Sequence, residues 1–315
     1  MAVPKILLYS NRENEIDEYA ELIEKASIEA ELLVCRNSAE VESKIPEAEI
    51  IFGVHLAPEA YLAARRLRWI QSMWAGVEGL LKSPLPPAVT ITKPFGVFGR
   101  YLSHYVFGNL LSKKIDCEGA LLSQSKCEWK PYRIELISGK CMGIAGMGDV
   151  AAEIALAARA FGMQIVALNS DGRPHKLADQ CFASRERERF VAACDVLVLT
   201  LPATDATRGM FNAGLLSHMR KDAWLINVGR GSLIDDSALI DILESGRIGG
   251  AVLDVFQEEP LPPEHPYWRL PNCVVTPHIA GPSLPAEITD CFLENFRRYR
   301  NSLPLLGLID QERGY

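Results

Sequence analysis

"GIAGMGDVAAEIALAARAFGMQIVALN", residues 143–169, is the stretch that decides the fold of this chain. It has the pattern of an apolar strand, a turn of the form G-x-G-x-x-A, an alanine-rich helix and a second apolar strand. Gly146 permits the tight turn, Gly148 lets a pyrophosphate approach the backbone, and Ala151 lets helix and strand pack closely. This order of elements predicts a dinucleotide-binding unit, the alternative being a glycine turn that serves packing alone.

The end of the second strand bears on the choice of dinucleotide. It is Asn169, where a protein selective for NAD would carry Asp or Glu to bind the ribose 2′-hydroxyl. Ser170 and Arg173 follow and favour a 2′-phosphate, whereas Asp171 opposes it. The stretch therefore predicts that NADP is preferred, with NAD as the alternative. The phosphate contacts are expected on the turn and the first helical amides, at Gly146, Met147, Gly148, Asp149 and Val150.

Apolar runs alternate with segments of helical period along the whole chain, which is typical of parallel α/β sheets. At 315 residues the chain is long enough for two domains. We expect a Rossmann-type, doubly wound NAD(P)-binding domain at residues 98–282 and a smaller, flavodoxin-like α/β substrate domain at residues 1–97 plus 283–315. Residues 100–125 are expected to form one long helix, and a cleft is expected between the two domains.

The composition argues against several classes of partner and site. The net charge of −7 offers no basic field for a nucleic acid. No apolar run approaches the roughly 20 residues of a membrane span, and the N-terminus turns acidic too early for a signal peptide, so we expect a cytoplasmic protein. The eight cysteines form no C-x-x-C pattern and are expected to be reduced core thiols. No His or Cys cluster has metal-ligand spacing, so no metal site is expected.

Three polar residues of the second half each follow an apolar strand. Arg230 lies in "INVGRGSLID", Glu259 in "LDVFQEEPL" and His278 in "VTPHIAG". Because open parallel sheets bind ligands at the carboxyl ends of their strands, we expect these side chains to converge. Taken singly, they could be a salt-bridge arginine, an acidic loop residue and a structurally satisfied histidine. Their coincidence favours a catalytic site.

Together these motifs resemble the D-isomer-specific 2-hydroxyacid dehydrogenases, and among them the glyoxylate/hydroxypyruvate reductases and related 2-ketoacid reductases. The resemblance covers essentially the whole chain. It implies an oxidoreductase that transfers hydride from NAD(P)H to the 2-keto carbon of a short 2-ketoacid, giving a D-2-hydroxyacid. It also implies a homodimer, with residues 100–125 as a candidate interface. The motifs that carry it, in the family's order and spacing, are the G-x-G-x-x-A turn, "LPATDATRGMFN" (201–212), "INVGRG" (226–231), "LDVFQEEPL" (253–261) and "TPHIAG" (276–281).

The resemblance assigns a role to each candidate residue. Arg230 would bind the substrate carboxylate and polarise the keto group, and His278 would protonate the carbonyl oxygen. Glu259 would orient the imidazole and favour its charged form. Asp254 would contact the nicotinamide carboxamide. Further cofactor contacts would lie at Leu201, Pro202, Thr207, Val228, Gly229 and Gly281. Substrate contacts would lie in the turn of Trp74, Ala75, Gly76 and Val77, together with Arg230.

Other functions share these motifs. Phosphite or phosphoglycerate oxidation would keep all three catalytic residues, although phosphoglycerate dehydrogenases often append a regulatory domain. Formate dehydrogenases resemble this family but place Gln at the position of Glu259. Dinucleotide-sensing corepressors share the fold and bind cofactor without turnover. His104 stands where similar proteins usually carry glutamate, so the sequence leaves open which ketoacid is used.

Overall fold

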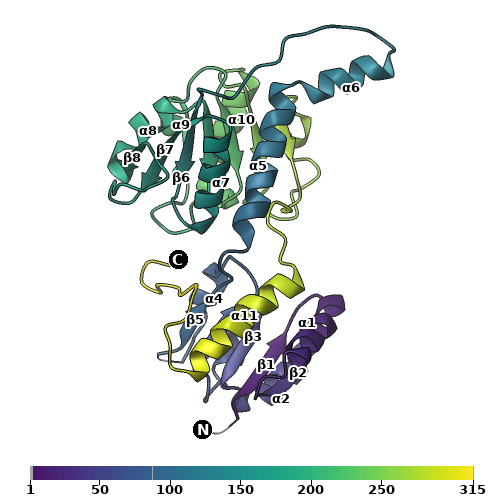
Figure 1. Cartoon of the computed structure of the whole chain (residues 1–315), viewed down its shortest axis with the longest axis vertical. Helices are drawn as coiled ribbons and strands as arrows, with labels where there is room; N and C mark the ends of the chain where they lie inside the picture. The colour runs from purple at the N-terminus through teal and green to yellow at the C-terminus, as the bar shows by residue number, and fades with distance from the viewer. Residues whose placement is uncertain (1–2, 87, 315) are drawn as a thin grey trace. The chain divides into compact units, whose positions relative to one another are not determined.

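The computed structural model describes residues 3–86 and 88–314 and divides the chain into two compact units. Unit 1 consists of Met1–Val97 with Ser283–Tyr315, and unit 2 of Phe98–Pro282. Each unit is built on its own parallel sheet with helices between the strands (Figure 1). The expected α/β class is therefore confirmed. Residues 1, 2, 87 and 315, which belong to the expected substrate domain, lie outside the described part.

Unit 1 has a five-stranded sheet of order β2-β1-β3-β4-β5, in which all neighbouring strands are parallel. This is the flavodoxin-like order. The strands are β1 (Lys5–Tyr9), β2 (Glu31–Cys35), β3 (Ile50–Gly53), β4 (Trp69–Ser72) and β5 (Thr90–Thr92). The helices are α1 (Glu13–Lys25), α2 (Ser38–Lys44), α3 (Pro58–Tyr61), α4 (Glu78–Leu81) and α11 (Pro285–Arg300).

The C-terminal helix α11 is an integral part of unit 1. Its Phe292 stacks on Phe52 of β3, with 4.3 Å between the ring centroids, and lies against Trp69 of β4. Asn295 of the same helix is fully buried and donates a hydrogen bond of 2.9 Å to Oε1 of Gln71. A segment from the end of the chain thus completes the core of the N-terminal sheet.

Unit 2 has a seven-stranded parallel sheet of order β12-β11-β10-β9-β6-β7-β8. With β6 counted as the first strand, this is the Rossmann order 3-2-1-4-5-6 with one strand added at the edge. The strands are β6 (Cys141–Ala145), β7 (Gln164–Asn169), β8 (Gln180–Ala183), β9 (Val196–Leu199), β10 (Trp224–Asn227), β11 (Gly250–Leu253) and β12 (Cys273–Val275). The helices are α5 (Phe98–Lys114), α6 (Cys117–Ser125), α7 (Asp149–Ala160), α8 (Arg187–Ala193), α9 (Ala213–Leu216) and α10 (Asp236–Glu244).

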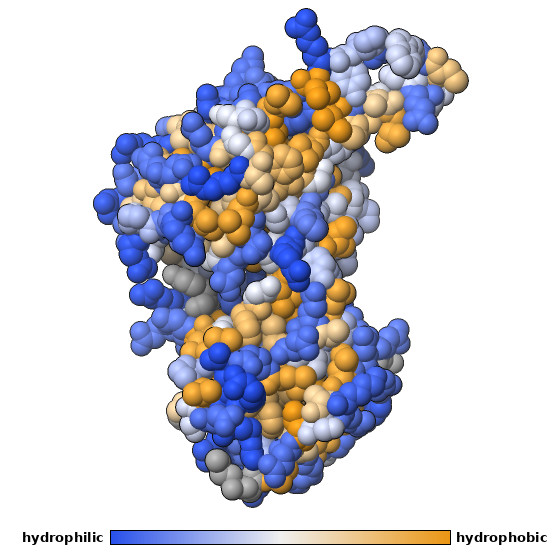
Figure 2. All heavy atoms as spheres, in the orientation of Figure 1, coloured by the Kyte–Doolittle hydropathy of each residue, from blue (hydrophilic) through white to orange (hydrophobic). Residues whose placement is uncertain are grey.

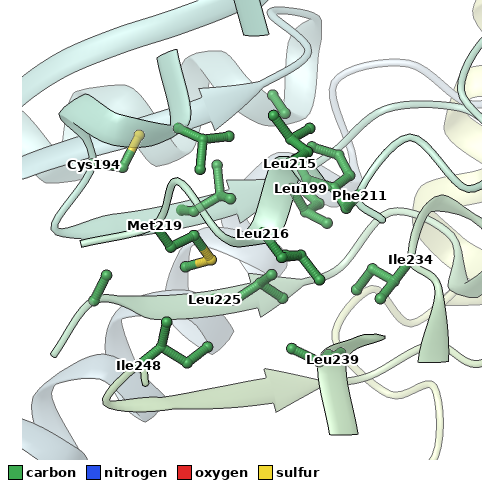
Figure 3. Close-up of a cluster of buried hydrophobic side chains, with 14 of the residues drawn as sticks. Cys194, Leu199, Phe211, Leu215, Leu216, Met219, Leu225, Ile234, Leu239 and Ile248 are labelled. Carbon is green, nitrogen blue, oxygen red and sulfur yellow. The ribbon is translucent and has the colours of Figure 1, made fainter. Parts of the chain in front are cut away.

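The core of unit 2 holds the strand ends in place. Side chains from β9, β10, α9 and α10 meet in one apolar cluster, in which Leu199, Leu225 and Leu239 are fully buried (Figure 3). Buried strands with both faces covered read as continuous apolar runs, and β9 has the sequence VLVL. The packed core leaves the polar residues that follow each strand at one edge of the sheet.

The prediction of one continuous helix over residues 100–125 is wrong, because the segment forms two helices. Helix α5 ends at Lys114 and a separate helix, α6, begins at Cys117. Between them Asp116 adopts a left-handed backbone with φ of +50°, and its Oδ1 accepts a hydrogen bond of 3.1 Å from the amide of Gly119. An aspartate that caps a new helix in this way cannot continue the preceding one. The chain therefore leaves α5 and forms a projecting arm (Figure 1).

Candidate active site

The dinucleotide turn has the conformation that its glycines permit. Gly146 lies between β6 and α7 with φ of +96°, a backbone region that other residues rarely adopt. A Cβ on Gly148 would meet no atom within 4 Å, so a phosphate group has open access to the backbone there. Ala151 is fully buried and packs the first turn of α7 on the sheet. The first amides of a helix have no intrahelical acceptor, so this turn fits a pyrophosphate.

The turn after β7 is held by Asn169. Its Oδ1 accepts from the amide of Gly172 at 2.5 Å, and its Nδ2 donates to the carbonyl of Arg173 at 2.8 Å. The Arg173 side chain is 76% exposed and pairs with Asp171, Nε to Oδ2, at 2.8 Å. The amide of Arg173 also donates to Asp171, and this bond is the main reason why the pKa of Asp171 lies below its ordinary value. Asn169 therefore shapes the turn, and its two charged residues face solvent as a pair.

The remaining predicted cofactor residues lie in loops that follow β9, β10 and β12. Thr207 is buried, and its hydroxyl donates to the carbonyl of Pro202 at 2.7 Å, which closes the loop after β9. Gly229 lies so near the carbonyl of Leu201 that a Cβ would be only 3.0 Å from that oxygen. Gly281 lies against Leu102 of α5. The amide of Val228 donates to the carbonyl of Leu199. A Cβ on Gly146 would lie 3.3 Å from Leu201, so the loop after β9 packs against the dinucleotide turn.

The structure brings the loops of the catalytic candidates together at one edge of the sheet. Arg230 follows β10, Glu259 follows β11 and His278 follows β12, and these three strands are parallel neighbours in register. A Cβ on Gly231 would lie 1.9 Å from the carbonyl carbon of Phe256, so the Arg230 loop rests directly on the loop that carries Glu259. The Arg230 guanidinium donates to the carbonyl of Gly229 at 2.7 Å.

His278 and Glu259 form a direct pair. Nδ1 of the imidazole lies 2.7 Å from Oε2 of the carboxylate. The other oxygen, Oε1, accepts from the amide of Phe256 at 2.9 Å, which fixes the carboxylate relative to its own loop. The histidine side chain is 53% exposed and the glutamate side chain 35%. Because the pair uses Nδ1, Nε2 is the ring nitrogen that can face a substrate.

Asp254 anchors the loop that carries His278. It is 1% exposed, and its carboxylate accepts hydrogen bonds from the amides of Ile279 and Ala280, both at 2.9 Å. Its own carbonyl accepts from the amide of His278, also at 2.9 Å. Asp254 therefore binds three consecutive amides of this loop. Its contact with a nicotinamide carboxamide stays a prediction.

The predicted substrate turn lies in unit 1, directly after β4. The hydroxyl of Ser72 accepts from the amide of Trp74 at 3.0 Å and so fixes the start of the turn. His55, which the sequence did not single out, lies beside it: its Nε2 is 3.2 Å from the carbonyl of Gly76, and its ring is 5.4 Å from that of Trp74. The turn is thus held by two polar side chains, while its role in substrate binding stays a prediction.

Two hydroxyls beside the His278 loop also escaped the sequence reasoning. Tyr105 of α5 and Thr276 are bonded to each other through their hydroxyl groups at 2.6 Å. They lie 171 positions apart along the chain, and no local pattern marks a contact over that distance. Among the described residues, no group of three or more His, Cys, Asp or Glu is placed to hold a metal ion. No helix of that same part is long and apolar enough to cross a membrane.

Comparisons with known proteins identify the family of the chain. The family model of the D-isomer specific 2-hydroxyacid dehydrogenase NAD binding domain matches residues 111–280. The chain is 30% identical to glyoxylate/hydroxypyruvate reductase A of Salmonella newport over 267 residues, which is 82% of this chain and 85% of that protein.

Two solved structures are similar over nearly the whole chain. A D-isomer specific 2-hydroxyacid dehydrogenase from Xanthobacter autotrophicus, in complex with NADPH and MES, has a TM-score of 0.90 at 26% identity and covers 100% of both chains. The NADPH-dependent glyoxylate/hydroxypyruvate reductase of Sinorhizobium meliloti, in complex with NADP and sulfate, has a TM-score of 0.89 at 26% identity and covers 99% of this chain and 100% of the other. The chain therefore belongs to the D-isomer specific 2-hydroxyacid dehydrogenase family and is an NAD(P)-dependent oxidoreductase.

Proposed function

We propose that this protein reduces a short 2-ketoacid of the glyoxylate or hydroxypyruvate type to a D-2-hydroxyacid, with NADPH as the preferred reductant. The observation that carries the proposal is the 2.7 Å contact between His278 and Glu259, placed beside the Arg230 loop at the carboxyl edge of the nucleotide-binding sheet. An imidazole paired with a carboxylate is suited to hold a proton, and a neighbouring guanidinium is suited to bind a carboxylate substrate.

Each residue then has a defined task. Bound NAD(P)H supplies the hydride that is added to C2 of the ketoacid. Arg230 binds the substrate carboxylate and draws electron density from the keto oxygen. His278 gives the proton on Nε2 to that oxygen as the hydride arrives, so the reaction consumes one proton for each reduced cofactor. Glu259 holds the imidazole by Nδ1 throughout.

The preference for NADPH rests on the turn after β7. Asn169 places no carboxylate where a 2′-phosphate would lie, and both of its amide atoms are used to shape the turn. The guanidinium of Arg173 is exposed beside it, and Ser170 offers a hydroxyl. The two structural neighbours described above hold NADPH or NADP. Asp171 offsets part of the charge of Arg173, so we expect a preference rather than an exclusion of NADH.

The test is the oxidation of NADPH and of NADH, at matched concentrations, with glyoxylate, hydroxypyruvate, pyruvate and a branched 2-ketoacid. We expect rapid turnover with one of the first two substrates, a higher kcat/KM with NADPH, and a product of D configuration where C2 becomes chiral. Turnover only in the reverse direction, with phosphite or phosphoglycerate, would replace this proposal with one of those oxidations. Tight cofactor binding with negligible turnover of every substrate would favour a dinucleotide sensor.

We also propose that the protein is a homodimer that uses the projecting arm of residues 117–136. Helix α6 has no buried residue, and apolar side chains of the arm are exposed, including Leu121 at 65%, Leu136 at 69% and Trp129 at 95%. Figure 2 shows apolar surface on the arm and over the adjacent end of α5. Contiguous exposed apolar surface on a soluble protein marks an interaction site. The arm carries balanced charges, Glu118, Glu128 and Glu135 against Lys126, Lys130 and Arg133, so two copies would not repel each other.

Light scattering coupled to size-exclusion chromatography tests the dimer. We expect the wild-type chain at twice its sequence mass, and the double variant Leu121→Glu/Trp129→Glu at the mass of one chain. The matched control is Leu62→Glu, because Leu62 is 69% exposed on unit 1, outside the arm. A wild-type chain of single mass, or a double variant that stays at twice the mass, would contradict the proposed interface.

We place this reduction in the cytoplasm. All eight cysteines lie within the described residues and are unpaired, and Cys35, Cys141, Cys194 and Cys291 are buried. Burial raises the pKa of the Cys35 and Cys141 thiols to about 11, which keeps them unreactive. Unpaired thiols are typical of proteins in a reducing compartment. Localisation of a fluorescent fusion in the native host, with an exported fusion as the control, tests this expectation.

A further inference from the structure

A chain of three hydrogen-bonded side chains runs from helix α5 to the loop that carries His278. The hydroxyl of Tyr105 lies 2.6 Å from Oγ1 of Thr276, and the hydroxyl of Thr276 donates to Oδ1 of Asp254 at 2.5 Å. Thr276 has a single hydroxyl proton and uses it in the hydrogen bond to the carboxylate. Tyr105 must therefore be the donor in the first bond. All three residues belong to unit 2.

The surroundings of Tyr105 favour this direction. Tyr105 is a half-buried residue of α5, and this burial raises the pKa of Tyr105 to about 12. The phenol is therefore protonated at neutral pH and remains a donor. Asp254 is 1% exposed, so a missing bond to its carboxylate could not easily be replaced by bulk water. The Asp254 end of the network is therefore shielded from bulk water.

The backbone of His278 needs such support. His278 has φ of +54°, in the left-handed region that is unfavourable for residues other than glycine. Conformations of this kind persist only where the surrounding structure holds them. The amides of Ile279 and Ala280 donate to the carboxylate of Asp254, and the amide of His278 donates to its main-chain carbonyl. The orientation of the carboxylate therefore fixes the peptide units that directly follow His278.

We propose that Tyr105 and Thr276 are positioning residues: their hydroxyls orient the Asp254 carboxylate, which holds the left-handed backbone of His278 and thereby aligns the imidazole with Glu259. Neither hydroxyl touches the substrate in this account. Without the Tyr105 hydroxyl the Thr276 hydroxyl loses the donor that orients it, its bond to the carboxylate is held less firmly, and the imidazole then occupies a wider range of orientations. The inference rests on the proposed function only for its kinetic consequence, since the geometry belongs to the protein itself.

The kinetic test compares Tyr105→Phe, Thr276→Val and Thr276→Ser with the wild type. We expect kcat to fall about tenfold in the first two variants, because displacement of a catalytic group by a fraction of an ångström is costly, while KM for the ketoacid and the Kd for NADPH stay within about twofold. Thr276→Ser keeps the hydroxyl and should restore most of kcat. Loss of activity in the serine variant equal to that in the valine variant would overturn the proposal, as would a wild-type kcat in Tyr105→Phe.

A matched control separates positioning from simple destabilisation. Tyr267 is 1% exposed in the same unit, and its hydroxyl donates to Oδ1 of Asp236 at 2.9 Å on helix α10, so its bond is not part of the Tyr105–Thr276–Asp254 network. Tyr267→Phe removes an equivalent buried bond and should lower the melting temperature about as much as Tyr105→Phe, with kcat unchanged. An equal loss of kcat in both tyrosine variants would mean that the effect is general loosening, and would overturn the proposal.

A measurement without turnover distinguishes this inference from the proposed function. NMR of protein labelled at the Cε1 carbon of histidine reports the environment of His278, whose signal is assigned by its absence in His278→Gln. We expect this signal to move or broaden in Tyr105→Phe and to stay in place in Tyr267→Phe. If no ketoacid is reduced by the wild type but the signal still moves, the proposed function fails and the positioning network stands. An unmoved signal in Tyr105→Phe overturns the network.

Discussion

The loop that carries His278 and the turn that begins at Asn169 both follow strands of the same sheet, yet they are held in opposite ways. The His278 loop is anchored to Asp254, a buried carboxylate that accepts from two amides and a hydroxyl. The Asn169 turn is held mainly by bonds between exposed or half-buried residues of its own, together with the hydroxyl of Ser184, which donates to the carbonyl of Asn169 at 3.3 Å. Its charged pair, Asp171 and Arg173, faces solvent.

This difference predicts which of the two segments tolerates substitutions with little loss of stability. A bond to a buried carboxylate contributes more than one between exposed groups, because water cannot replace it. Substitutions in the His278 loop should therefore damage both chemistry and folding. Substitutions in the Asn169 turn should alter the recognition of the cofactor and leave the fold intact. We therefore expect the His278 loop to tolerate few substitutions and the Asn169 turn to tolerate more.

The largest effect is expected in the His278 loop, from the variant His278→Gln. Glutamine can donate a hydrogen bond but cannot deliver a proton, so kcat for ketoacid reduction should fall by about 10² to 10⁴-fold. The Kd for NADPH, measured by fluorescence quenching, should stay within about twofold of the wild type. Wild-type-like turnover in this variant would remove His278 from the mechanism.

A pair of matched aspartate variants tests the contrast in stability. Asp254→Asn would turn an amide group toward donors that now meet carboxylate oxygens, so the free energy of unfolding should fall by about 2–3 kcal/mol. Asp171→Asn changes a side chain that is 49% exposed and should shift the free energy by less than about 0.5 kcal/mol. Urea denaturation followed by circular dichroism measures both. Equal losses in the two variants would break the comparison.

The role of the Asn169 turn in the choice of cofactor is tested by Asn169→Asp. A carboxylate at this position would repel a 2′-phosphate and bind a ribose hydroxyl, so the ratio of kcat/KM with NADPH to that with NADH should fall about tenfold. The matched control is Asn212→Asp, since Asn212 caps α9 and should accept this change with the ratio unaltered. An unchanged ratio in Asn169→Asp would mean that this turn does not select the cofactor.

The smallest effect is expected from Glu259→Gln, which keeps the shape of the pair and removes its negative charge. The amide still accepts a hydrogen bond from Nδ1 but no longer forms a charge-assisted one, so the imidazole is held less firmly and kcat for ketoacid reduction should fall about threefold. Steady-state rates, with kcat and KM treated separately, measure the loss. A kcat equal to that of the wild type would show that the shape of the pair is sufficient and its charge is not needed.

The parts of the fold that follow from local patterns could be predicted from the sequence. The alternation of strands and helices indicated two parallel sheets, and the G-x-G-x-x-A turn marked the start of α7. The break between α5 and α6 was missed because Asp116 could equally sit on the surface of a continuous helix. What ends α5 is the left-handed backbone of Asp116, whose side chain caps a new helix, and α6 then has no buried residue.

The candidate site also contains residues that could be predicted from the sequence and residues that could not. Arg230, Glu259 and His278 could be placed near one another because each follows a strand and parallel strands align their ends. The contact of Tyr105 with Thr276 could not, because it depends on how α5 crosses the sheet. The anchoring role of Asp254 was also missed, since a sequence does not show that three consecutive amides turn toward one residue.

The most direct test of the central claim is the rate at which the wild-type protein oxidises NADPH in the presence of glyoxylate or hydroxypyruvate. The account predicts rapid oxidation with at least one of them, with one proton taken up for each NADPH consumed and a slower rate with NADH. Firm binding of NADPH without oxidation by either ketoacid would contradict the claim that the His278–Glu259 pair and Arg230 form a 2-ketoacid reductase site.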